Sequence, residues 1–212
     1  MQNKLISRIA NGLGNQLFMY ASSYSISKKL GKELEIDDES GFLKERRNLK
    51  YELNNFNISS KITNNKYKFK TFKKNLIRKI YKKIDHFKVK KKFIIEYKNK
   101  KGFINYSEKY IKKEYENIAF IEGYFQSEKY FKEYEYDLRK ELSFNEKITN
   151  KHSDIKNKIL ESNSVQIHIR NHVFTETKQK RENHHNIKKS EIYTKKTIEH
   201  CKNAINFIKS KT

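Results

Sequence analysis

A glycine-spaced segment near the start of the chain has residue types that suit phosphate binding. Residues 11–16 read NGLGNQ, with Gly12 and Gly14 two positions apart. Between a strand and a helix, small residues let a ligand approach the backbone, and the N–H groups of the helix N-terminus attract a phosphate. The amide of Asn15 adds a hydrogen-bonding group. The segment matches neither the dinucleotide-binding nor the ATP-binding glycine pattern, so it predicts either another kind of ligand loop or a tight strand-to-helix turn.

A histidine and an arginine stand at the end of a second apolar segment. Residues 164–171 read SVQIHIRN, which predicts a strand with His168 and Arg170 on one face. Ligands of open α/β sheets lie beyond the carboxyl ends of strands, where an arginine can hold a diphosphate through two hydrogen bonds. The alternative is an arginine in a structural salt bridge beside a core histidine.

A third segment, 122–128, reads EGYFQSE and follows an apolar run. A glycine after a strand, with polar residues before a helix, is compatible with the wall of a binding site and also with a structural turn. Glu122 and Glu128 are candidates for acid–base chemistry, although no partner residue stands out for either of them.

Metal and disulfide chemistry have little support in the sequence. His172, His184 and His185 match no zinc-ligand spacing, and Cys201 is the single cysteine. We therefore expect no metal site and no disulfide framework, and a reducing cytoplasm as the compartment.

The elements expected around the first segment form a strand–helix–strand unit. Residues 1–10 predict a strand, and apolar residues at mostly helical spacing predict an amphipathic helix over 17–30. Gly31 is the usual residue after a helix end, and 33–37 reads as a second strand. Such a βαβ unit indicates a parallel sheet and an α/β fold.

The rest of the chain continues this alternation. The further expected elements are a basic amphipathic helix over 72–87, strands over 92–97 and 118–121, helices from Ser127 and over 146–162, the strand 164–171 and a last helix over 193–208. Ser127 is a candidate N-cap for the helix that follows it.

The positive charge of the chain is large and unevenly distributed. The 212 residues carry 48 Lys and Arg against 25 Asp and Glu, which gives a net charge of +23. The stretch 61–101 holds 17 of the basic residues, against Asp85 and Glu96. Such a stretch favours binding to an anionic partner: nucleic acid, acidic lipid or a phosphorylated small molecule. The alternative without a binding role is a solvated lysine-rich face. No apolar run is long enough for a membrane span, and the N-terminal one is too short for a signal peptide.

Three of these segments together resemble the bacterial α-1,2-fucosyltransferase family. Residues 11–37 are similar to its N-terminal loop, helix and strand. GYFQSEKYF (123–131) is similar to an internal segment, and SVQIHIR (164–170) to its V-x-x-H-x-R-x-G-D motif. The order and approximate spacing also agree, and the resemblance is weak over 40–105.

The resemblance implies a GT-B arrangement of two Rossmann-like domains. An acceptor-side domain would span 1–155, with the basic insertion near 61–101, and a donor-binding domain would begin in 156–212. The implied activity is inverting transfer of L-fucose from GDP-fucose to the 2-hydroxyl of a galactose-ended glycan such as O-antigen, with no cofactor and no metal. The implied location is cytoplasmic, with peripheral contact to the anionic inner face of the membrane and no specific nucleic-acid partner.

The resemblance also implies roles for single residues. Arg170 would contact the donor diphosphate with His168 beside it, and these two are the candidate catalytic residues. The loop residues that match the family's nucleotide-sugar contacts are Gly12, Gly14, Asn15 and Gln16. Without a metal, a fixed guanidinium and backbone N–H groups would stabilise the departing GDP. No general base for the acceptor hydroxyl is identified.

The sequence also departs from the family pattern. Asn11 replaces the first loop glycine, Met19 replaces a glutamine, and 171–173 read NHV where Arg-Gly-Asp is expected. The family continues beyond the position of Thr212, so we expect the chain to be truncated within the donor domain. Two alternatives stay open: a catalytically inactive remnant of such an enzyme, and a basic protein that binds lipid or nucleic acid.

Overall fold

The computed structural model of the protein describes residues 2–43, 48–96, 105–169 and 184–210. The chain divides into two compact units, Met1–His152 and Ser153–Thr212. The first unit contains a sheet with its covering helices, and the second contains two of the described helices, so each is considered by itself.

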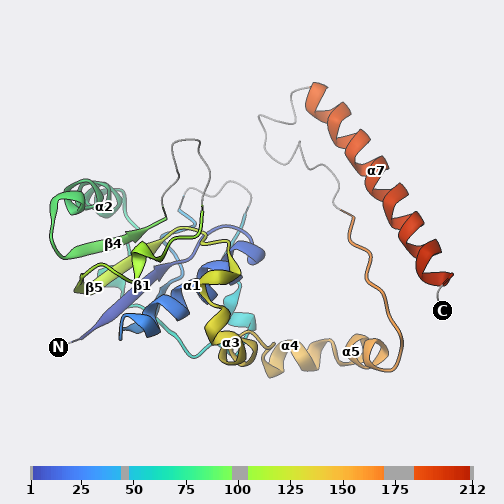
Figure 1. Cartoon of the computed structure of the whole chain (residues 1–212), viewed down its shortest axis with the longest axis horizontal. Helices are drawn as coiled ribbons and strands as arrows, with labels where there is room; N and C mark the ends of the chain where they lie inside the picture. Colours follow the sequence, from blue (N-terminus) through green and yellow to red (C-terminus); the bar gives the residue numbers. More distant parts are fainter. Residues whose placement is uncertain (1, 44–47, 97–104, 170–183, 211–212) are drawn as a thin grey trace. The chain divides into compact units, whose positions relative to one another are not determined.

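Five parallel strands form the sheet of the first unit (Figure 1). They are β1 Lys4–Arg8, β2 Glu33–Asp37, β3 Lys61–Ile62, β4 Lys91–Ile95 and β5 Tyr115–Glu122, in the spatial order β3-β2-β1-β5-β4. The predicted α/β class with a parallel sheet is confirmed, and the short β3 has no counterpart among the predicted strands. The sheet is consistent with a Rossmann-like domain.

The two halves of the sheet meet beside β1. From β1 the chain proceeds to β2 and β3 on one side, and it then crosses to β4 and β5 on the other. Open α/β sheets bind ligands outside the carboxyl ends of their strands, at the point where the strand order reverses. Here that point lies between β1 and β5, where residues 9–12 and 123–127 leave the sheet.

Two apolar clusters cover the two faces of the sheet. Leu5 and Ile6 are adjacent in β1, so their side chains point to opposite faces, and both are fully buried. Leu5 belongs to the larger cluster, which includes residues of α1, and Ile6 belongs to a smaller one with Phe93 and Phe120. Burial on both faces explains the consecutive apolar residues of β1, β4 and β5.

Helix α1 (Leu13–Lys29) connects β1 to β2 and differs from its prediction. Every residue from Met19 to Ser27 is buried, so the predicted amphipathic character is wrong. The helix also begins at Leu13, before the predicted start at Leu17. Its serines can lie inside because their hydroxyl groups find partners there, as shown below. Gly31 has φ 61°, which confirms the predicted helix end.

Helix α2 (Phe72–Ile84) and the 3₁₀ turn η3 (Asp85–Phe87) confirm the predicted basic helix. Thr71 caps α2, because its side chain accepts a hydrogen bond from the backbone N–H of Lys74 at 3.2 Å. Buried Asp85 ties the other end to β4 by accepting from the N–H groups of Lys92 and Phe93 at 2.6 and 3.0 Å. The helix is therefore fixed to the edge strand of the sheet.

Two of the longer predicted helices are divided into shorter helical segments. The remaining elements of the first unit are η1 Leu53–Asn55, η2 Asn65–Tyr67, η4 Glu108–Tyr110, η5 Glu128–Tyr130, η6 Lys132–Tyr134, α3 Glu135–Glu141 and α4 Glu146–Lys151. Ser127 is the N-cap residue of η5, and its side chain makes no capping hydrogen bond. The helix predicted over 146–162 is interrupted between Lys151 and Ser153, where His152 has φ −122°.

The second unit contains helices α5 (Ser153–Leu160) and α7 (His184–Lys209). The predicted strand is wrong for 164–169, which are irregular and exposed. A strand needs a neighbour to pair its backbone groups, and the described part of this unit supplies none. The donor-binding domain expected to begin in 156–212 stays a prediction. Among the residues described, no helix has the length and apolar character for a membrane span.

Candidate functional site

The loop after β1 turns sharply into α1. Asn11 has φ 69°, in the left-handed region that glycine adopts most easily and asparagine tolerates best among the other residues. Its side-chain oxygen accepts a hydrogen bond from the backbone N–H of Gly12 at 2.9 Å. Asn11 therefore supports the sharp turn that joins β1 to α1.

Gly12 and Gly14 are not required by the fold. Gly12 has φ −72°, and Gly14 lies within the first turn of α1, so neither needs a conformation special to glycine. Apart from its chain neighbours and the backbone of α1, a Cβ atom added at either position would have no atom of the described residues within 4 Å. At Gly123, by contrast, φ is 149° and an added Cβ would lie 2.4 Å from that of Glu96. The open space over the first two glycines favours a ligand-binding loop over a purely structural turn.

The segment 123–131 lies against the glycine loop. The side-chain amide of Asn11 donates to the Tyr124 hydroxyl at 2.9 Å, and that of Gln126 donates to the Asn15 side-chain oxygen at 2.6 Å. Two of the three segments that carry the family resemblance are therefore neighbours at the reversal point of the sheet. They lie more than 100 residues apart in the sequence.

Buried serines of α1 hold this second segment in place. Ser22 donates to the carbonyl oxygen of Phe125 at 3.1 Å, and Ser25 donates to that of Tyr130 at 2.6 Å. Phe125 is fully buried with φ 47°, a strained conformation for a bulky residue. The hydrogen bonds from α1 stabilise the segment despite that strain.

Gln16 joins the glycine loop to residues 50–52. It is fully buried, and its amide nitrogen donates to the carbonyl oxygens of Asn11 and Lys50 at 2.7 and 2.8 Å. Its side-chain oxygen accepts from the Glu52 N–H at 2.9 Å. The structure thus gives Gln16 a positioning role, while its contact with a ligand stays a prediction, as do those of Gly12, Gly14 and Asn15.

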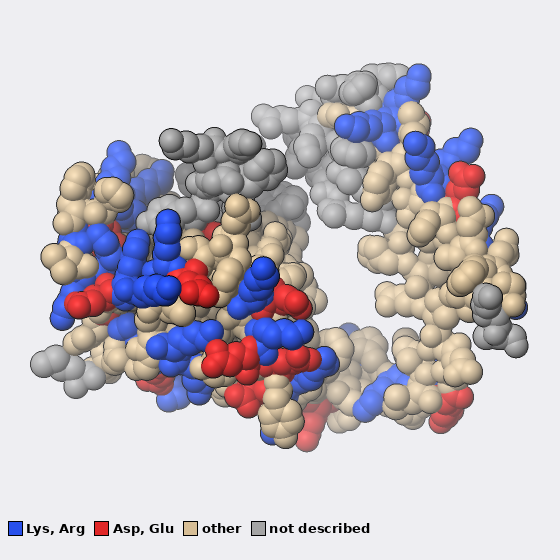
Figure 2. Space-filling view, in the orientation of Figure 1, with Lys and Arg blue, Asp and Glu red and all other residues tan. Residues whose placement is uncertain are grey.

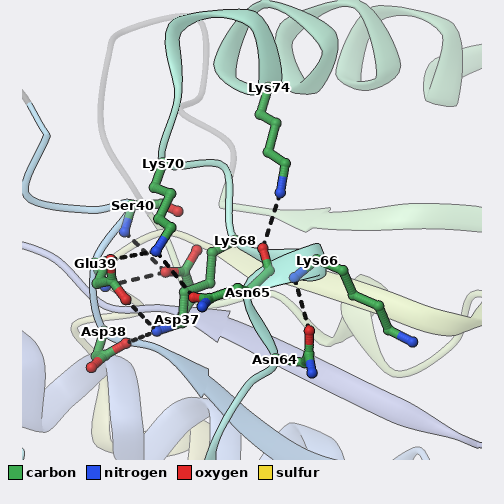
Figure 3. A network of polar contacts seen from close by, with 10 residues as sticks. All are labelled: Asp37, Asp38, Glu39, Ser40, Asn64, Asn65, Lys66, Lys68, Lys70 and Lys74. Atoms are coloured by element: carbon green, nitrogen blue, oxygen red, sulfur yellow. Dashed lines mark hydrogen bonds and ion pairs between the residues drawn. The ribbon is translucent and has the colours of Figure 1, made fainter.

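A network of ion pairs fixes the chain at the carboxyl end of β2 (Figure 3). The Asp37 carboxylate accepts from the Ser40 N–H at 2.9 Å, and the ammonium of Lys68 lies 2.6 Å from both Asp38 and Glu39. Burial lowers the pKa of Lys68, but the two carboxylates outweigh this effect and raise it above its usual value. Lys68 therefore stays charged and anchors this turn.

Charged residues end β1 and β5 at the same edge. Arg8 donates to the Ser40 carbonyl at 2.6 Å, and burial lowers its pKa. Glu122 lies 2.6 Å from Arg78 and 2.8 Å from Lys82, both on α2. Burial raises the pKa of Glu122, but the two cations outweigh it and hold the pKa below the ordinary value. A carboxylate held ionised in this way is a structural ion pair rather than a proton donor at neutral pH.

Among the described residues, four buried polar atoms at or near this edge have no hydrogen-bond partner. They are Arg8 Nε, Ser40 Oγ, Tyr51 OH and Glu96 Oε1. Burial raises the pKa of the Tyr51 hydroxyl, which therefore stays protonated. Unpaired buried groups are unfavourable unless a ligand or water completes them. Sequence reasoning missed these residues, although a charged residue at the end of an apolar strand, as at Arg8 and Glu96, is a readable signal.

A hollow of about 110 Å³ lies next to the segment 123–131. Its lining includes three tyrosines, Tyr106, Tyr124 and Tyr130, together with the polar Glu96 and Gln126. Burial raises the pKa of Tyr130 to about 12, so its hydroxyl is protonated at neutral pH. Aromatic faces with amide and carboxylate groups suit a polyhydroxylated ligand such as a sugar.

The predicted catalytic pair belongs to the second unit. His168 is exposed in an irregular segment, and Arg170 lies outside the described residues, as does His172. Within 2–43, 48–96, 105–169 and 184–210, no three His, Cys, Asp or Glu side chains gather as metal ligands. The roles of His168 and Arg170 therefore stay predictions.

Comparison with known proteins identifies a relative of this chain. The chain is similar to an alpha-1,2-colitosyltransferase from Escherichia coli, with 31% identity over 166 residues. The alignment covers 78% of this chain and 53% of that enzyme, so the chain spans about half the length of the curated relative it matches. No family model and no solved structure matches the chain. The similarity shows that the chain has a glycosyltransferase as a relative. The parallel α/β sheet of this chain is consistent with a Rossmann-like glycosyltransferase.

Proposed function

We propose that the protein acts in glycosyl transfer, moving a sugar from a nucleotide-sugar donor to a hydroxyl group of a glycan. In its specific form, the proposal is transfer of an L-fucosyl or colitosyl group from its GDP-linked donor to the 2-hydroxyl of a galactose-ended surface glycan. The similarity to an alpha-1,2-colitosyltransferase supports the reaction class, and the family resemblance of 11–37, 123–131 and 164–170 supports the finer form.

The observation that carries the proposal is the open surface over Gly12 and Gly14. Neither glycine is required by backbone conformation or packing, and both lie where the sheet order reverses. A ligand that approaches the backbone accounts for both facts. The N-terminus of α1 would face the anionic part of the donor or of the departing nucleotide.

Further groups of the two units have complementary roles in this proposal. The tyrosine-lined hollow, with the polar Glu96 and Gln126 in its wall, would hold the acceptor sugar. Arg170, with His168 beside it, would contact the diphosphate, consistent with an acceptor-side domain over 1–155 and a donor-side domain from 156. No metal enters the proposed reaction.

A graded substitution at Gly14 tests the loop directly. Transfer to a galactose-ended acceptor is measured with GDP-fucose and with GDP-colitose, using the protein expressed from its complete gene, and NMR of the product gives the linkage. Gly14→Ala and then Gly14→Val should lower transfer progressively, because each added carbon fills ligand space. The melting temperature should not fall, since both residues suit a helix at least as well as glycine.

Gly123→Ala is the matched control, and it should lower the melting temperature because its Cβ has no room. Unchanged transfer by the stable Gly14→Val variant would show that the loop is a structural turn. Absence of transfer from either donor, with no binding of GDP-fucose in calorimetry, would overturn the proposed function and favour an inactive remnant.

A further inference from the structure

Helix α2 turns its polar residues toward the protein. The more covered positions on this helix are Lys74, Asn75, Arg78 and Lys82, which recur at helical spacing and are all polar. Arg78 and Lys82 reach the buried Glu122, and Lys74 donates to the carbonyl oxygen of Asn65 at 3.0 Å. Buried ion pairs, rather than an apolar stripe, therefore attach α2 to the sheet.

Much of the apolar surface of α2 consequently lies on the side away from the sheet, whereas Tyr81 faces β4, where the Lys92 ammonium lies 5.2 Å from the centre of its ring. The exposed large apolar side chains of α2 and the residues just after it are Phe72, Leu76, Ile77, Ile80, Tyr81, Ile84, Phe87 and Val89. Phe72 and Phe87 are each 86% exposed. Within α2, residues 72, 76, 80 and 84 recur every four positions, so they form one continuous stripe. We call this stripe with Phe87 the apolar face of α2.

Lysines surround the apolar face. Lys73, Lys79 and Lys83 are exposed on the helix, and Lys88 and Lys90 follow it. Figure 2 shows Lys and Arg side chains beside uncharged surface over the α2 side of the molecule. An exposed apolar stripe with a basic border has the composition of helices that lie in the interface of an anionic bilayer.

We propose that α2 and η3 dock the protein on an anionic lipid surface, which goes beyond the proposed transfer reaction. The apolar face would enter the boundary between headgroups and acyl chains, and the long lysine side chains would reach the lipid phosphates. Nucleic acid would satisfy the lysines but would leave aliphatic side chains such as Leu76 and Ile80 without a partner. The inward ion pairs of Arg78 and Lys82 hold the helix in place, so docking needs no unfolding of the sheet.

A single tryptophan can report this docking, because the natural chain contains none. Phe72→Trp places the probe on the apolar face, and Tyr136→Trp places one on α3, where Tyr136 is 71% exposed. With vesicles of phosphatidylglycerol and phosphatidylcholine in equal parts, emission of the Phe72→Trp protein should shift to the blue. The Tyr136→Trp protein should show no shift, and neither protein should respond to pure phosphatidylcholine.

Two variants separate the apolar and the basic contributions in vesicle co-sedimentation. Leu76→Glu with Ile80→Glu should abolish binding, whereas the same pair of changes at Ile155 and Ile159 of α5, which are 60% and 53% exposed, should leave it intact. Replacing Lys73, Lys79 and Lys83 by Gln should weaken binding by at least tenfold, since each lysine near an anionic surface contributes about fivefold.

Three results would overturn the docking proposal. The first is equal binding of the wild type and the Leu76→Glu, Ile80→Glu variant to the vesicles. The second is binding of the protein to a single-stranded oligonucleotide without binding to the vesicles. The third is a lipid-free dimer that this variant converts to a monomer, which would assign the apolar face to a second copy. None of these results depends on glycosyl transfer, so docking and the proposed function fail independently.

Discussion

Helices α1 and α2 both depart from the rule that apolar residues lie inside and polar residues outside, in opposite ways. In α1 buried serines lie among apolar residues, and Ser22 and Ser25 donate to the segment that walls the candidate site. In α2 the charged side lies inward on Glu122, and the apolar side lies outward. A polar residue inside a protein is stable when its hydrogen bonds are completed, and both helices meet that condition.

The difference between the helices lies in what each face serves. The buried polar groups of α1 and Gln16 organise loops that leave the sheet edge, so they support a ligand site within the first unit. The exposed apolar face of α2 has no such internal use among the described residues. A comparison of matched substitutions in the two helices can therefore test each assignment.

The largest expected loss of stability is at a buried isoleucine of α1, and an exposed isoleucine of α2 is its control. Ile26 in α1 is 2% exposed and Ile80 in α2 is 48% exposed. Ile26→Ala should lower the free energy of unfolding by about 3 to 4 kcal/mol, because it leaves a cavity. Ile80→Ala should change it by about 0.5 kcal/mol or less, as for other exposed sites. Urea denaturation measures both, and a large loss at Ile80 would show that the apolar face of α2 is packed in the folded protein.

The second effect tests the ion pair that attaches α2. Arg78→Ala leaves Glu122 with one of its two cations and should cost about 3 kcal/mol of unfolding free energy. Arg139→Ala removes the exposed pair of Arg139 with Glu135 on α3 and should cost about 0.5 kcal/mol or less. Equal losses in the two variants would mean that α2 is not held by its buried charges.

The same pair makes stability depend on pH in a defined direction. The pKa of Glu122 is held below 4.5 in the folded protein, so its contribution is present above about pH 4.5 and is lost as the pH falls through the folded pKa. The difference in unfolding free energy between the wild type and Glu122→Gln should therefore shrink below pH 4.5. A difference that grows on acidification would contradict the assigned pKa direction.

The smallest effect compares a buried and an exposed serine. Ser25 donates to the Tyr130 carbonyl at 2.6 Å inside the protein, and Ser143 donates to the Lys140 carbonyl at 2.7 Å at the surface. Ser25→Ala should cost about 1 to 2 kcal/mol, since it leaves a buried carbonyl oxygen unpaired. Ser143→Ala should cost about 0.5 kcal/mol or less. Similar values would mean that the segment 123–131 does not depend on α1.

Short-range patterns predicted several features correctly. The alternating strand 33–37 and the preceding helix end at Gly31 were readable because strand propensity and the left-handed glycine are local properties. The basic helix over 72–87 was readable for the same reason. The strand over 164–169 was not, since pairing depends on a neighbour that local sequence does not supply.

The candidate site was only partly predictable. The glycine loop and the segment 123–131 were recognised separately, but their contacts through Asn11 and Gln126 join residues more than 100 positions apart. Arg8, Tyr51 and Glu96 were missed, because their unpaired buried atoms arise from packing rather than from spacing.

The sequence by itself determined the parallel α/β class, the position of the glycine loop and the basic character of α2, because composition and local periodicity set these features. Only the tertiary structure decided that Gly12 and Gly14 have open space, that Gln16 is a buried positioning residue, and that the apolar side of α2 faces outward. The physical reason is that periodicity defines which residues share a face of a helix. The contacts between distant segments decide which face is covered.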